Sequence, residues 1–250
     1  MKDNQAYLIN NKIIATHSKA VFHEGNSTVY DEIEALKTAS GTGTVNKNIF
    51  NKWYGKKLTI FGDSISTMAS GYKSMISEDL NMTLQTWAVS GSGWGYTTSS
   101  NTSNSAVSRA SAVTTTGDLV IFFYGTNDWQ FGSVPFGEFG DTTADTFNGS
   151  VYKTLLDYTT KYPEKRVVVM TPLRRQGDEE ANSYGKTLID YVDAIIKNAN
   201  SLAVPVLDLY RNSGMNTNIG SHYSYYGDLH PNSTGMRRIA DMLESFVDTL

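Results

Sequence analysis

The sequence predicts an α/β protein, a three-layer α/β/α sandwich built around a mostly parallel five-stranded sheet. Short apolar runs, of which 119–124 (LVIFFY) is the clearest, alternate along the chain with longer segments of helical periodicity such as 147–162. Continuous apolar runs are typical of strands that are covered on both faces, as strands in parallel sheets are. Hydrophobic residues make up 40% of the 250 positions, so a chain of this length can bury a substantial core.

The predicted elements alternate from residue 56 to the end of the sequence. Strands are expected at 58–61, 84–89, 119–124, 166–170 and 204–209, where apolar residues cluster. Helices are expected at 72–80, 147–162, 181–198 and 233–250, and the Ser/Thr-rich stretch 97–116 is expected to be an irregular loop. Strands that are separated by helices favour parallel pairing.

Residues 1–55 differ from the rest of the chain. They are rich in Asn, Lys, Thr and Ser and contain no clear buried strand. A short amphipathic helix is expected at 29–37, and the stretch 40–48 (SGTGTVNKN) is typical of a flexible linker. So short a helix is marginal alone and needs a partner. We therefore predict a main domain at 56–250 and an N-terminal appendage at 1–55, which is a possible element of homo-oligomer assembly.

Composition excludes several classes of function. The net charge of −4 is spread along the chain, which argues against a nucleic-acid partner. Cysteine is absent, so disulfides, thiolate catalysis and cysteine–zinc sites are excluded. No stretch approaches the ~20 apolar residues of a membrane span, and the N-terminus lacks the apolar core of a secretory signal. We expect a soluble protein that is either cytoplasmic or acts on a virion or outside the cell without a classical export signal.

Small, polar or titratable residues follow four of the five predicted strands. In an open parallel sheet, ligands bind beyond the carboxyl ends of the strands, so these four segments are expected to converge on one edge. Each segment alone is also typical of an ordinary turn or helix cap. The segments are Gly62-Asp63-Ser64, Ser90-Gly91-Ser92-Gly93, Gly125-Thr126-Asn127-Asp128 and Asp228-Leu229-His230-Pro231.

The residue types in these segments suit nucleophilic catalysis by a serine. Asp228 and His230 are two positions apart, which in an extended chain places both side chains on one side, about 6.5–7 Å apart. The carboxylate can then fix the imidazole tautomer and leave the far nitrogen free as a general base. The side-chain amide of Asn127 and the backbone amides of Ser64 and Gly91 could donate hydrogen bonds to a developing oxyanion.

Taken together, the four segments resemble the blocks of the SGNH hydrolases, also called the GDSL esterase/lipase family. The resemblance covers about residues 56–250 and implies Ser64 as nucleophile, Asp228 and His230 as the other catalytic residues, and Ser64, Gly91 and Asn127 as the oxyanion hole. Two positions depart from the family pattern. Ile65 stands where the family often has Leu, and block two has Trp87 or a neighbour where the family often has Asn, so Gly91 is the least secure assignment.

The resemblance implies hydrolysis of an oxygen ester through an acyl-enzyme, with no metal and no organic cofactor. Because the sequence contains no long apolar lid, we expect a small acyl group, acetyl above all, on a carbohydrate. Three residues near the predicted site are candidates for substrate binding: Trp94 and Trp129, for which core packing is the alternative, and Arg174, for which, as for Arg175, simple exposure is the alternative.

Two other functions remain open from the sequence. One is a lipolytic esterase or lysophospholipase. The other is a non-catalytic glycan-binding module of a tail or surface assembly. The stretch 16–36 (THSKAVFHEGNSTVYDEIEAL) resembles connecting segments of phage tail and baseplate proteins, which suggests a virion-associated or prophage esterase that acts on surface polysaccharide. A pure binder has no physical need for Ser64, Asn127, Asp228 and His230 together, which favours the enzyme. The expected partner is therefore a small-molecule or polysaccharide ester.

Overall fold

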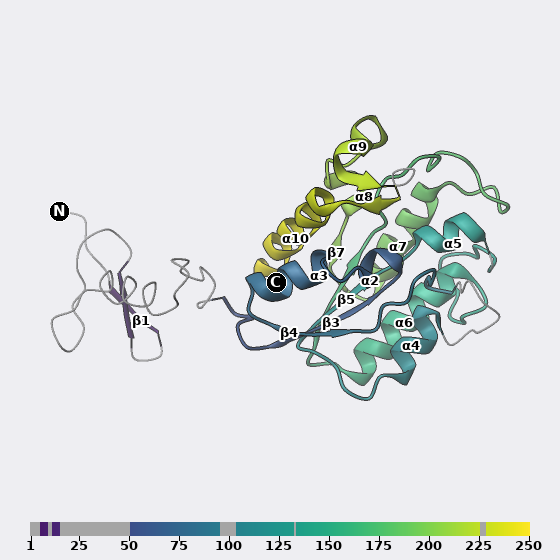
Figure 1. The fold of residues 1–250 in the computed structure, drawn as a ribbon. Coiled ribbons are helices and arrows are strands. Elements are labelled where there is room, and N and C mark those ends of the chain that lie inside the picture. The colour runs from purple at the N-terminus through teal and green to yellow at the C-terminus, as the bar shows by residue number, and fades with distance from the viewer. Residues whose placement is uncertain (1–5, 10–11, 16–50, 96–103, 133, 226–228) are drawn as a thin grey trace, which may run out of the picture. The chain divides into compact units, whose positions relative to one another are not determined.

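The computed structural model describes residues 6–9, 12–15, 51–95, 104–132, 134–225 and 229–250 (Figure 1). The chain divides into two compact units, Met1–Lys47 and Asn48–Leu250. In the first, β1 (Ala6–Ile9) and β2 (Lys12–Ala15) form an antiparallel hairpin. No clear buried strand was expected in this part of the chain. Both runs contain isoleucine and flank an Asn-Asn pair, a combination that favours a hairpin. The predicted helix 29–37 and linker 40–48 lie outside the described residues.

The second unit is built on a five-stranded sheet in which every neighbouring pair is parallel. This confirms the predicted α/β fold class. β5 (Leu119–Phe123) is the central strand of this sheet, and all five of its residues are buried. In spatial order the strands are β4 (Thr83–Thr86), β3 (Lys57–Gly62), β5 (Leu119–Phe123), β6 (Arg166–Met170) and β7 (Val206–Leu207).

Helices cover both faces of this sheet, as Figure 1 shows. Alternate residues of β5 point to opposite faces: Val120 and Phe122 pack in one core cluster, Leu119, Ile121 and Phe123 in the other. The first cluster is completed by α4 (Ala106–Ala112), α6 (Phe147–Lys161) and α7 (Leu188–Ser201). The second is completed by α3 (Tyr72–Asp79) and α10 (Ser233–Asp248). Short elements make up the carboxyl edge and its loops: α2 (Ser64–Thr67), α5 (Thr126–Phe131), α8 (Leu209–Asn212), η2 (Thr217–Ile219), α9 (Gly220–Tyr223), β8 (Ser224–Tyr225) and β9 (His230–Pro231).

Two predicted strands are shorter than expected. The strand at 84–89 ends at Thr86, although the N–H groups of Trp87 and Val89 still donate to β3 carbonyls at 2.8 and 2.9 Å. The strand at 204–209 is reduced to Val206–Leu207. Pro205 has no N–H for the ladder, and the Asp208 carboxylate accepts from the Arg211 N–H to cap α8.

Two helical expectations also differ from the structure. The helix expected at 181–198 begins at Leu188, because Thr187 and Asp190 form a capping box there and Asn182 folds a turn with Lys186. The stretch 97–116, expected to be a loop, contains α4, whose N-cap Ser105 accepts from the Ser108 N–H. Within the part of the chain that the structure describes, no helix is long and apolar enough to cross a membrane.

Candidate active site

Ser64 and His230 are in direct contact. Ser64 is the first residue of α2, directly after β3, and His230 begins β9, directly before α10. Ser64 Oγ lies 2.8 Å from His230 Nε2, which is hydrogen-bond distance for a nucleophile and its base. Both residues are partly exposed, so a small molecule can reach the pair. Asp228, the predicted orienting carboxylate, lies outside the described residues.

The turn before Ser64 requires glycine at one position. A Cβ on Gly62 would lie 2.1 Å from Ser66 Oγ and 3.3 Å from the Phe123 carbonyl oxygen, so no larger residue fits. Asp63 then caps α2, and its buried carboxylate accepts a hydrogen bond from the Ile65 N–H at 3.0 Å. As the first residue of the helix, Ser64 has no intrahelical acceptor for its own N–H.

Asn127 is held at the start of α5 with one side-chain hydrogen still available. Its Nδ2 donates to the Ser92 carbonyl at 2.8 Å, and the residue is buried. A side-chain amide has two N–H donors, and the second has no acceptor among the described residues. Gly91 precedes Ser92 and has a φ of +74°, a conformation that favours glycine. The Gly91 N–H makes no backbone hydrogen bond within the described residues.

The loop after β4 is tied to α5 by a second contact. The carboxylate of Asp128 is buried and accepts from the N–H groups of Trp94 and Gly95, at 3.0 and 3.1 Å. A Cβ on Gly93 would lie 2.3 Å from Asp128 Oδ2, so the loop approaches the carboxylate as closely as glycine permits. Asp128 and Ser92 were not singled out in the sequence analysis, although both occur in its four segments. Their burial was the missing signal.

Two titratable groups at the site have shifted pKa values. Burial raises the pKa of the Asp63 carboxyl to about 7, with a further rise from the nearby carboxylate of Asp128. Burial lowers the pKa of His230, and the positive charge of Arg175 lowers it further. A lower pKa favours the neutral imidazole, which is the form that can accept a proton from Ser64.

The three residues predicted to bind substrate have different surroundings. Trp94 is fully buried and stacks on Phe122 in the core, so the structure corrects this expectation: no face of its ring is open to a substrate. Trp129 lies on α5 beside Asn127 and is mostly buried; its Nε1 donates to the Glu180 carbonyl at 3.3 Å. Neither indole contributes a large exposed surface to the site.

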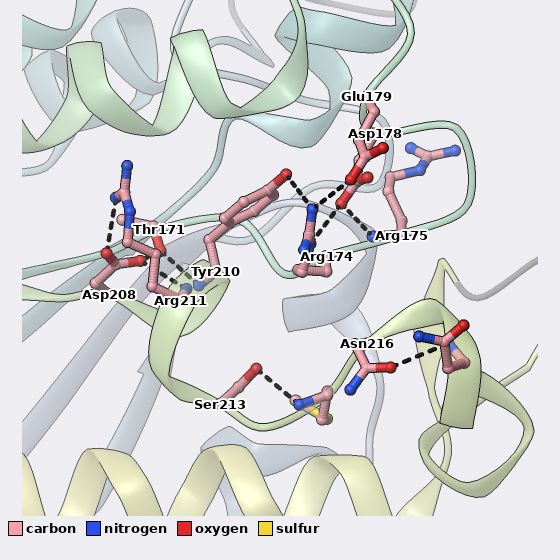
Figure 2. Close-up of polar contacts among 12 residues, drawn as sticks. Thr171, Arg174, Arg175, Asp178, Glu179, Asp208, Tyr210, Arg211, Ser213 and Asn216 are labelled. Atoms are coloured by element: carbon pink, nitrogen blue, oxygen red, sulfur yellow. Dashed lines mark hydrogen bonds and ion pairs between the residues drawn. The ribbon is translucent and has the colours of Figure 1, made fainter.

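Arg174 is occupied by neighbours in its own loop. It forms ion pairs of 3.1 Å with Asp178 and Glu179, and its guanidinium lies over the Tyr210 ring, 4.8 Å from the centroid. Figure 2 shows Arg174 between these partners. Among the described residues, Arg175 is the charged side chain that lowers the pKa of His230, and it was expected to be simply exposed.

A small cavity of about 10 Å³ lies next to these residues. Its wall includes the residue that precedes each of three site residues: Asp63 before Ser64, Thr126 before Asn127 and Leu229 before His230. Because these neighbours share one cavity wall, the three segments converge as the sheet topology predicts. Arg175 completes the wall.

The chain is similar to known proteins in sequence and in fold. Residues 60–238 match the sequence profile of the GDSL-like lipase/acylhydrolase family. No curated protein matches the chain by sequence.

Solved structures share the fold. A protein from Lactobacillus plantarum has 28% identity and a TM-score of 0.70, over 78% of this chain and 98% of its own. A lipase/acylhydrolase from Enterococcus faecalis has 14% identity and a TM-score of 0.57, over 78% and 96%. An acetyl xylan esterase has 20% identity and a TM-score of 0.53, over 76% and 99%.

Proposed function

Because the chain belongs to the GDSL-like lipase/acylhydrolase family and is therefore a hydrolase of ester bonds, we propose that Ser64 is its nucleophile and His230 its general base. The single observation that carries this proposal is the 2.8 Å contact between Ser64 Oγ and His230 Nε2. Asp228 is proposed to hold the other ring nitrogen, which its position two residues before His230 allows.

The reaction follows from these roles. Ser64 Oγ attacks the ester carbonyl carbon while its proton passes to His230 Nε2, and the carbonyl oxygen becomes an oxyanion. The proton then passes from Nε2 to the departing alcohol oxygen, which leaves the acyl group on Ser64. Water attacks this acyl-enzyme, gives its proton to Nε2, and the acid is released as Ser64 regains a proton.

Three donors are proposed for the oxyanion. The Ser64 N–H stands at the start of α2, the Gly91 N–H has no backbone acceptor among the described residues, and Asn127 retains one amide hydrogen after donating to Ser92. Preorganised donors of this kind stabilise the charge that develops in the transition state.

We propose a small acyl group, most simply acetyl, on a carbohydrate as the substrate. The sequence contains no long apolar lid, which favours a small acyl group. The structural likeness to an acetyl xylan esterase is consistent with this choice. Trp129 and Arg174 remain proposed flanking residues of the substrate site. Rates that rise from acetyl to decanoyl p-nitrophenyl esters would instead indicate a lipolytic enzyme, and a panel of acetylated glycans would identify the alcohol.

The activity itself is tested with p-nitrophenyl acetate. The wild type is expected to hydrolyse it and Ser64→Ala to be inactive. Ser66→Ala is the matched control, because this serine lies in the same helix but its Oγ is fully buried and bonded to Tyr72 Oη at 2.8 Å. Equal background rates for wild type and Ser64→Ala would refute the proposed esterase activity and favour a non-catalytic glycan-binding module.

The N-terminal unit is proposed to be an appendage that serves assembly. Its separation as a compact unit, Met1–Lys47, supports this proposal. The solution mass of the full chain, compared with a chain lacking these residues, is the test. A monomer in both cases would remove the assembly role without affecting the proposed chemistry.

A further inference from the structure

We propose that Arg175 is a positioning residue for ester hydrolysis, which clamps α5 so that Asn127 is correctly placed and adds a positive charge beside His230. This inference rests on the proposed function, because it concerns the residues assigned there to the oxyanion and to proton transfer. Arg175 itself is not proposed to touch the substrate.

The clamp consists of three contacts from one side chain to one short helix. Arg175 Nη1 donates to Thr126 Oγ1 at 3.0 Å and to Gln130 Oε1 at 2.8 Å. Its guanidinium also lies over the Trp129 ring, 5.3 Å from the centroid. The three partners are therefore held by a single planar group that comes from the loop after β6. Asn127 lies between two of these partners in the sequence and cannot shift without disturbing them.

α5 needs such a clamp because it has little stability of its own. It is six residues long, and its N-cap, Gly125, supplies no side-chain hydrogen bond. Isolated helices of this length do not form in water, so tertiary contacts must hold it. The Asn127–Ser92 bond restrains the side chain, and Asp128 restrains the next residue. Arg175 adds contacts to Thr126, Trp129 and Gln130. Asn182 Nδ2 also donates to the Trp129 carbonyl at 3.0 Å.

Within the described residues no carboxylate forms an ion pair with Arg175, although the charges of Asp178 and Asp63 act on it at longer range. The adjacent Arg174 is ion-paired with Asp178 and Glu179, whereas the guanidinium of Arg175 forms no ion pair within the described part of the chain. Its Nε is buried and has no hydrogen-bond partner among the residues that the structure describes. A partly buried, unpaired cation acts over several ångströms, because little solvent screens it.

The other elements packed on His230 bring few competing charges. α2 and β8 contain no charged residue. On α10, Arg237 is paired with Asp79 and Asp241, and Arg238 donates to the Ser213 carbonyl at 3.0 Å. Asp63 is buried at the N-cap of α2, and burial favours its neutral form. Asp228 lies outside the described residues. None of the variants below changes it, so its effect on His230 is the same in all of them.

The test compares three variants with the wild type on p-nitrophenyl acetate. For Arg175→Gln we expect kcat to fall by about 10- to 100-fold with KM little changed, since misplacement of about 1 Å has effects of this size. The acid limb of kcat/KM should move to higher pH, because loss of the positive charge lets His230 hold its proton more tightly. Arg175→Lys retains the charge but not the planar fork, so the acid limb should stay in place while kcat remains reduced.

Arg211→Gln is the control, because it removes one positive charge from an arginine of α8 that is ion-paired with Asp208 at 2.9 Å and has no described contact with α5. Its kcat and its pH profile should equal those of the wild type. Thr126→Val removes the hydroxyl that accepts from Arg175, and the two side chains have nearly the same shape. This variant replaces Arg175→Gln as the test if Arg175→Gln does not fold. It should lower kcat severalfold without a pH shift, and an unchanged kcat in Thr126→Val would overturn the clamp.

An NMR titration of the histidine ring signals supplies a readout apart from activity. The chain has four histidines, so the His230 signal can be assigned by its loss in His230→Gln. Its pKa should rise in Arg175→Gln and stay near the wild-type value in Arg175→Lys. An unchanged kcat and an unchanged His230 titration in folded Arg175→Gln would overturn the inference, as would a rise in KM at constant kcat. An inactive wild type would instead refute the proposed function, so the two failures are distinguishable.

Discussion

Ser64 Oγ and His230 Nε2 lie 2.8 Å apart, although 166 residues separate them in the chain. The contact joins the end of the first strand of the main sheet to the segment that leads into the last helix. Its geometry suits transfer of a proton from the hydroxyl to the imidazole.

The two residues are expected to act as one unit. His230→Gln should lower kcat by between about 100- and 10,000-fold, because the proton of Ser64 then has no acceptor. The double variant Ser64→Ala/His230→Gln should be no slower than Ser64→Ala alone, since loss of either partner removes the same step. Steady-state kinetics on p-nitrophenyl acetate measure both. Strictly multiplicative losses in the double variant would contradict a shared step.

Asn127 should contribute to kcat more than to KM. Asn127→Ala is expected to lower kcat by about 100- to 1,000-fold, the usual effect of removing one oxyanion donor. Asn198→Ala is the matched control: this amide is also buried and donates to Asn148 Oδ1 at 2.9 Å, but it lies in α7, outside the site. Asn198→Ala should lower the free energy of unfolding and leave kcat unchanged. A similar kcat loss in both variants would mean that Asn127 only supports the fold.

Asp63 should make the folded protein less stable as pH rises. Its pKa is about 7 in the folded protein against an ordinary value of 3.8, so the folded state holds this proton more tightly than the unfolded chain. That stabilisation is fully present below about pH 4 and is lost between about pH 4 and 7. At about 1.4 kcal/mol per pKa unit, the loss amounts to roughly 4 kcal/mol.

Asp63→Asn isolates this effect, because Asn keeps the cap on the Ile65 N–H but does not ionise. Urea unfolding at several pH values should show the wild type losing stability relative to Asp63→Asn as pH rises from 4 to 8. Asp141→Asn is a control of opposite sign: hydrogen bonds from Thr146 and the Glu138 N–H lower the pKa of Asp141. Its stabilisation should be lost as pH falls. Parallel curves for wild type and Asp63→Asn would refute the prediction.

Trp94 should affect stability but not substrate binding. Trp94→Phe leaves a cavity in the aromatic cluster with Phe122 and Tyr124, so the free energy of unfolding should fall. Large-to-small changes at such sites cost about 1–4 kcal/mol. KM for a small ester should stay within about twofold of the wild type, because the ring has no exposed face. A selective rise in KM for glycan esters would return Trp94 to the substrate site.

The strands that the sequence predicts well are those with continuous apolar runs. The run at 166–170 is observed as β6, Arg166–Met170, since buried strands carry their signal in every residue. α4 was missed because its sequence, AVSRASA, has only small residues and one arginine, which resemble a polar loop. β7 was overestimated because Pro205 and Asp208 limit the ladder on both sides.

The sequence indicated which residue types would form the candidate site, but it did not indicate which other side chains would surround them. The four segments identify Ser64, Asn127 and His230, because their residue types follow strand ends, and strand ends of a parallel sheet converge. The surroundings of the candidate residues could not be predicted. Trp94 follows the second segment and Arg174 follows the fourth strand in sequence, yet Trp94 packs in the core and Arg174 is paired with Asp178 and Glu179. Arg175 differs from Arg174 by one position, and only its contacts with α5 distinguish it.

By itself, the sequence determined the fold class, the succession of strands and helices, and the chemical groups that end the strands. These features are local, since apolar periodicity and turn residues act over a few positions. The tertiary structure alone decided the strand order β4-β3-β5-β6-β7, the Ser64–His230 contact and the clamp from Arg175 to α5. Each of these features joins segments that are far apart in the sequence. It depends on how helices pack on both faces of the sheet, which no short stretch of the chain determines.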